Sequence, residues 1–74
     1  MPHQPFTETT MKVPSGLRAD IKGLANKYGG EEQMQMKASE PKMYLLKFHF
    51  STPFEMGNFH RDALKLASDI EIIN

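Results

Sequence analysis

The strongest constraint on the fold is the order in which the hydrophobic period changes along these 74 residues. Apolar residues recur at helical spacing in two segments, Leu17 to Tyr28 and Phe59 to Ala67. Shorter runs typical of β-strands precede, separate and follow these two segments. The predicted order is therefore strand, helix, strand, strand, helix, strand, which limits the chain to a small set of α+β arrangements.

The alternation of side chains predicts where the strands lie and which way they face. We predict strands at 7–13, 33–38, 43–50 and 69–73, and the third of these is the most apolar. The residues expected to face the helices are Met11, Val13, Met34, Met36, Tyr44, Leu46, Phe48, Phe50, Ile70 and Ile72.

Local sequence chemistry marks the ends of the two helices. The first helix is expected near 14–29, with either Ser15 as its N-cap or Pro14 as its first residue. Gly29-Gly30 is expected to end it, because glycine adopts the left-handed conformation without steric cost. The second helix is expected near 53–68, and Thr52 to Glu55 is typical of a capping box. Its predicted apolar stripe comprises Phe59, Ala63, Leu66 and Ala67.

Together these features predict a ferredoxin-like split β-α-β-β-α-β sandwich, in which a four-stranded antiparallel sheet carries both helices on one face. The first and third strands are expected to be central. Residues 7–74 would form this single α+β domain, and residues 1–6 a flexible N-terminal arm. The chain starts without a signal peptide and has no apolar run of membrane-spanning length, so we expect a cytoplasmic protein that does not bind membranes.

The motifs of the chain do not favour an enzyme. The triplet His60-Arg61-Asp62 matches the start of a protein-kinase catalytic loop, but that family's glycine-rich loop and Asp-Phe-Gly motif are missing. The histidines His3, His49 and His60 have no metal-ligand spacing and are expected at the surface, and the chain has no cysteine. We therefore predict no enzymatic activity, no cofactor and no metal site.

The open face of the predicted sheet is the best candidate for a binding surface. It would expose Met43 and Leu45 among polar neighbours, a pattern typical of interaction sites. The edge strand at 33–37 contains no proline and a single charge, so its backbone is poorly protected against pairing. We predict a protein-binding or regulatory module that binds another protein or forms a homodimer. The predicted contact residues are Gln33, Gln35, Lys37, Met43, Leu45, Lys47 and His49.

A nucleic-acid-binding regulator is the alternative function. Its contact residues would be the basic side chains in and before the first helix, Lys12, Arg18, Lys22 and Lys27. The run from Thr9 to Arg18 also resembles the opening of a ribbon-helix-helix repressor, although strand-patterned residues follow where the second helix of that family would begin. An RNA-recognition domain is not favoured, because the aromatic residues of the third strand fall on the helix-covered face.

Overall fold

The computed structural model describes residues 7–73, and it confirms the α+β class, with a four-stranded antiparallel sheet and two α-helices. The arm predicted at residues 1–6 lies outside the described residues. The elements in chain order are β1 (Thr7–Pro14), a 3-10 helical turn η1 (Ser15–Leu17), α1 (Arg18–Lys27), β2 (Glu31–Lys37), β3 (Met43–Phe50), α2 (Pro53–Leu66) and β4 (Glu71–Ile72).

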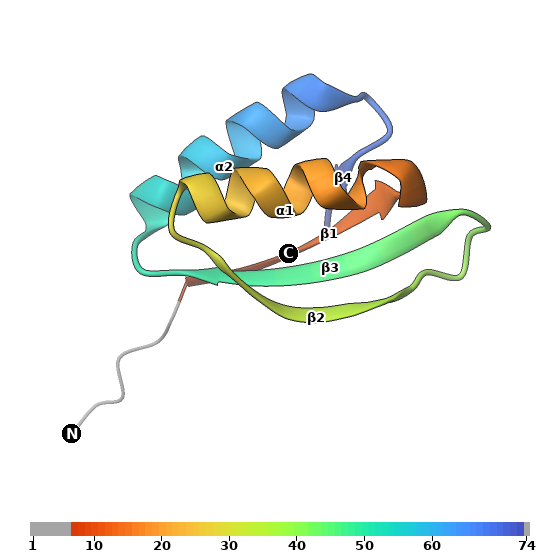
Figure 1. Cartoon of the computed structure of the whole chain (residues 1–74), viewed down its shortest axis with the longest axis horizontal. Coiled ribbons are helices and arrows are strands. Elements are labelled where there is room, and N and C mark those ends of the chain that lie inside the picture. The colour runs from red at the N-terminus through yellow and green to blue at the C-terminus, as the bar shows by residue number, and fades with distance from the viewer. Residues whose placement is uncertain (1–6, 74) are drawn as a thin grey trace.

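The sheet has the strand order β2-β3-β1-β4, so β1 and β3 are central, as predicted, and β2 and β4 are the edges. Both helices lie on one face of this sheet (Figure 1). The hydroxyl of Tyr28, the C-cap residue of α1, donates to Asp62 Oδ2 of α2 at 2.5 Å, and this bond holds the pKa of Asp62 below its usual value. Within residues 7–73, no helix has the length and apolar character needed to cross a membrane.

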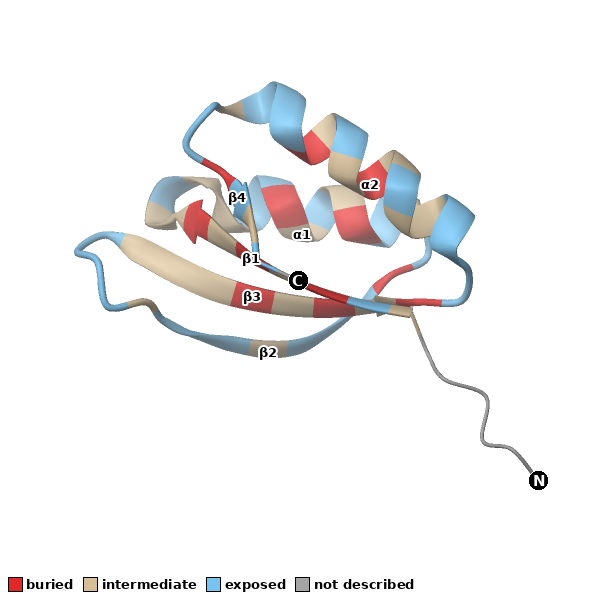
Figure 2. Cartoon of the chain, turned by 180° about the vertical axis from the view of Figure 1, so that it is seen from behind, coloured by how far each residue is buried: buried red, intermediate tan, exposed pale blue. Residues whose placement is uncertain are grey.

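The core lies between the helices and the sheet, and aromatic rings form its centre. Phe48 and Phe50 of β3 contact Phe59 of α2, with ring centroids 5.3 and 5.0 Å apart. Figure 2 shows buried positions on the two central strands and on both helices. The buried apolar residues are Met11, Val13, Ile21, Ala25, Leu46, Phe48, Phe50, Phe59, Ala63 and Ile70.

The end of α1 agrees with the sequence, whereas its start does not. Gly29 has φ +79°, its N–H donates to the Asn26 carbonyl, and the Gly30 N–H donates to the Ala25 carbonyl, which is a Schellman cap. At the start, the chain first makes the 3-10 turn η1, for which Pro14 is the N-cap. Both alternatives predicted for this helix start are therefore wrong, because the turn precedes the α-helix.

The start of α2 is capped as predicted, but only in one direction. Thr52 Oγ1 accepts from the Glu55 N–H at 3.2 Å. The reciprocal bond of a capping box is missing, because Glu55 Oε1 is buried without a hydrogen-bond partner among the described residues. The helix ends at Leu66 rather than near 68, and that side chain is 43% exposed instead of lying in the core.

A β-bulge in β2 decides which side chains reach the uncovered face of the sheet. The register between β2 and β3 shifts between Glu32 and Met34, which leaves Gln33 as the extra residue. Residues directly opposite each other in an antiparallel pair share a face. Glu32 therefore shares the helix-covered face with Phe48, whereas Met34 shares the other face with Lys47.

The predicted faces of β2 are consequently wrong from Met34 onward. Met34 and Met36 lie on the face that no described helix covers, called the open face from here on, and Met36 is 50% exposed. Gln35 and Lys37 lie opposite core-facing residues of β3 and so belong to the helix side. A single extra residue produces this inversion, because side chains alternate with a period of two along a strand.

Candidate functional site

The open face carries an apolar patch formed by neighbouring residues of β2 and β3. Met36 lies directly opposite Leu45, and Met34 lies one pair further along the same face. Met43 belongs to the same face, because it precedes Leu45 by two residues on β3. We call these four residues, Met34, Met36, Met43 and Leu45, the methionine patch. Methionine side chains are flexible and polarisable, and they are common on surfaces that bind proteins.

Ion pairs border the methionine patch on the open face. Lys47 Nζ lies 3.3 Å from Glu8 Oε1. Lys12 Nζ lies 2.6 Å from Glu40 Oε1 and 3.2 Å from Glu71 Oε1, and the hydrogen bond to Glu40 raises the pKa of Lys12. These pairs place both signs of charge beside the methionine patch, on the side of it that adjoins β1.

The open face includes some of the predicted contact residues. Met43, Leu45, Lys47 and His49 alternate along β3 on this face. The other three predicted residues lie on β2, and two of them do not share this face. Gln33 is the extra residue of the bulge, while Gln35 and Lys37 lie on the helix side. Sequence reasoning missed Met34 and Met36, because the alternation of β2 taken alone carries no sign of the bulge.

The edge of the sheet at β2 is exposed along most of its length. Six of its seven residues are exposed, and Met34 is partly buried. Its outer side has no strand neighbour in the described part of the chain, since β2 pairs only with β3. The backbone groups on that side are therefore available to another strand.

The four basic residues of the nucleic-acid alternative do not form one surface. Lys12 lies on the open face, whereas Arg18, Lys22 and Lys27 lie on α1, on the opposite side of the sheet. Lys12 is bound to two carboxylates, and Lys22 Nζ lies 3.5 Å from Glu32 Oε1. The four predicted contact residues therefore do not offer one shared basic surface, and ion pairs neutralise two of them.

A pocket that the sequence did not reveal lies at one end of the sheet. It has a volume of about 390 Å³ and lies where the β2–β3 turn meets η1 and the first turn of α1. The lining residues come from two separate segments, 15–18 and 37–44, and no short motif connects them.

His60 differs from the surface residue that the sequence predicted. Its Nε2 lies 2.7 Å from Oγ1 of Thr9, which is fully buried in β1. Burial lowers the pKa of His60, because the charged imidazolium loses hydration. Among residues 7–73, no group of three histidine, cysteine or acidic residues is arranged to hold a metal ion.

This environment predicts a loss of stability in mild acid. Since the pKa of His60 is lower in the folded protein than in the unfolded chain, stability is full above the unfolded value of about 6.5 and falls as the pH decreases through the two pKa values. We expect the melting temperature to fall more between pH 7.5 and pH 5 in the native protein than in His60→Gln. An equal fall in both proteins, measured by circular dichroism, would assign the acid sensitivity to other groups.

Comparisons with protein-family models and with curated protein sequences find no match for this chain.

Proposed function

We propose that this chain is a small protein-binding module whose interface is the open face, with the exposed β2 edge at its rim. The observation that carries the proposal is the β-bulge at Gln33, which turns Met34 and Met36 outward beside Leu45. Burial of the Met34 and Met36 side chains under the helices would stabilise the fold, so folding stability does not explain their position on the open face. Flexible apolar side chains flanked by ion pairs instead suit a contact surface.

A second copy of the chain is the partner that we propose first. A twofold dimer needs only one self-complementary patch, and the open face has an apolar centre with both signs of charge beside it. Two copies can therefore meet without like charges dominating the contact, in keeping with the net charge of +0. The strand order β2-β3-β1-β4 supports placing the chain among ferredoxin-like split βαβ sandwiches, whose uncovered sheet face is free for such a contact.

Sedimentation velocity of two matched variants tests this proposal. Met36→Lys adds a positive charge to the methionine patch, and Gln35→Lys adds the same charge at the next residue on the helix side. Both positions are exposed, so both variants are expected to fold. We expect the native protein to dimerise, Met36→Lys to dimerise at least about tenfold more weakly, and Gln35→Lys to behave like the native protein.

Two results would count against a dimer formed through the methionine patch. Equal weakening by both substitutions would show that charge on β2, rather than the methionine patch, controls association. A native protein that stays monomeric at millimolar concentration would exclude the second copy as a partner. Capture of a different protein that is lost with Met36→Lys but kept with Gln35→Lys would retain the open face and replace the proposed occupant.

A further inference from the structure

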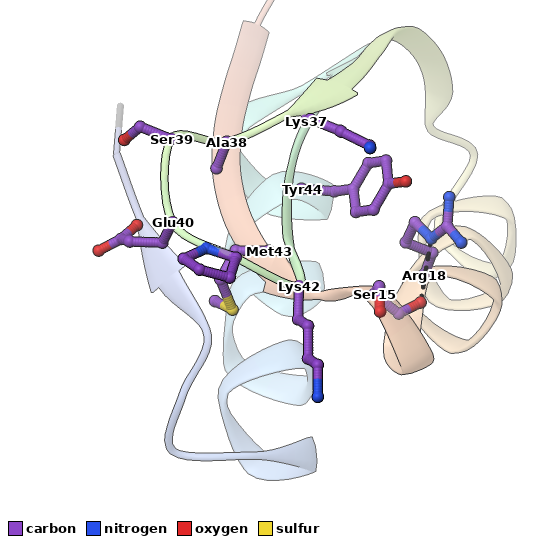
Figure 3. Close-up of a pocket in the computed structure, with 10 residues that line it drawn as sticks. Ser15, Arg18, Lys37, Ala38, Ser39, Glu40, Lys42, Met43 and Tyr44 are labelled. Carbon is purple, nitrogen blue, oxygen red and sulfur yellow. Dashed lines mark hydrogen bonds between the residues drawn. The ribbon is translucent and has the colours of Figure 1, made fainter.

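The pocket at the end of the sheet adjoins the open face, because Met43 of the methionine patch is one of its lining residues. Its walls come from η1, the start of α1 and the turn that joins β2 to β3 (Figure 3). The Ser15 N–H donates to the Lys42 carbonyl at 2.9 Å and connects the two walls. A further bond, from the Ala38 N–H to the Met43 carbonyl at 3.0 Å, closes the turn. The backbone that frames the pocket is therefore held by hydrogen bonds.

Three cations line this pocket without a carboxylate to balance them. Arg18, Lys37 and Lys42 form no ion pair with any acidic residue that the structure describes, and the acidic lining residue, Glu40, is bound by Lys12 instead. Elsewhere, an acidic partner is present for Lys12, Lys22, Lys47 and Arg61, whereas Lys27 and Lys65 form no ion pair with the described acidic residues. The pocket therefore concentrates positive charge that the chain does not neutralise, although the whole chain has a net charge of +0.

Contacts within the pocket fix the orientation of the Arg18 guanidinium group. Its Nε donates to the Ser15 carbonyl at 3.0 Å, and its central carbon lies 4.0 Å from the centroid of the Tyr44 ring. The terminal N–H groups of Arg18 have no partner among the described residues. Figure 3 shows the ends of Arg18 and Lys37 beside the Tyr44 ring, whereas Lys42 extends away from that ring. A planar fork of donors held in this way suits two oxygens of one anion.

We propose that this pocket binds a small molecule that carries a phosphate monoester. A monoester near neutral pH has a charge of about −1.5 to −2 and three acceptor oxygens, which suit an arginine fork with lysines nearby. The volume of about 390 Å³ is near the lower end of small-molecule sites, so the ligand is small. The ring of Tyr44 and the hydroxyl groups of Ser15 and Ser39 supply contacts for the rest of the ligand. This proposal does not depend on the dimer.

An NMR titration of the full chain at constant ionic strength tests the site. The probes are inorganic phosphate, glycerol 3-phosphate and, for comparison, acetate. We expect saturable amide shifts confined to residues 15–18 and 37–44, with both phosphates binding more tightly than acetate. Shifts that do not saturate, that appear equally around exposed lysines elsewhere, or that are as strong with acetate would overturn the proposal as an adventitious ionic effect.

Three substitutions separate binding from folding. Arg18→Gln removes the fork, and we expect phosphate to bind at least about tenfold more weakly, the usual effect of losing charge-assisted hydrogen bonds. Lys42 has φ +64°, a conformation that glycine adopts freely, so Lys42→Gly is expected to keep the fold while weakening binding severalfold. Lys65→Gln removes the same charge from the last turn of α2 and is expected to leave binding unchanged.

The amide spectrum of each variant reports its folding in the same experiment. If the folded Arg18→Gln variant binds phosphate with native affinity, the Arg18 guanidinium group does not bind the phosphate. If Lys65→Gln and Lys42→Gly lower the affinity for phosphate equally, the total charge of the chain, rather than this pocket, attracts the anion.

Discussion

Phe48→Ala is expected to lower the free energy of unfolding by about 3–5 kcal/mol, because it removes a large buried ring and leaves a cavity. The Phe48 side chain is 1% exposed, and its ring meets Phe59 edge to face at 5.3 Å. A domain of this size has little stability to spare, so a loss of this size is expected to unfold most of the protein. The change in the free energy of unfolding is measured by urea denaturation, followed by circular dichroism.

The neighbouring residue provides the control for Phe48→Ala. Lys47 lies on the open face, where its ammonium group pairs with Glu8 at 3.3 Å in partly exposed surroundings. Exposed ion pairs contribute little, so Lys47→Ala is expected to cost less than about 0.5 kcal/mol. Similar losses from the two substitutions would mean that β3 is shifted by one residue relative to its neighbours.

Gly30→Ala is expected to destabilise the fold by about 1–3 kcal/mol through steric overlap. A Cβ atom at residue 30 would lie 2.5 Å from Cε2 of Phe50, and that ring is fully buried and has little room to move. Gly57 in the middle of α2 is the matched control, because a Cβ atom there meets nothing within 4 Å. Gly57→Ala is expected to stabilise the protein by about 1 kcal/mol, since alanine favours helices over glycine.

Thermal unfolding of the two alanine variants measures this contrast directly. We expect the two melting temperatures to change in opposite directions. If Gly30→Ala melts at or above the native temperature, the close contact between the α1–β2 turn and Phe50 is excluded.

The candidate site was predicted only in part. The faces of β3 follow from its own sequence, whereas the faces of β2 depend on how β2 pairs with β3. The side chains of β3 alternate regularly along the whole strand, so Met43, Leu45, Lys47 and His49 could be assigned to one face from the sequence. The side chains of β2 also alternate, but the bulge at Gln33 exchanges the two faces from Met34 onward. The bulge is a property of the pairing between two strands, and the sequence of one strand does not record it.

Features that depend on neighbouring residues were determined by the sequence alone. Examples are the glycine cap at Gly29, the Thr52 cap of α2 and the inward face of β3, since backbone sterics, short hydrogen bonds and a period of two act within a few residues. The tertiary structure alone decided the contacts between distant segments. It brought Lys12 to Glu40 on the open face and placed Arg18 against Tyr44 beside the pocket, because pairing between strands and packing of helices set these distances.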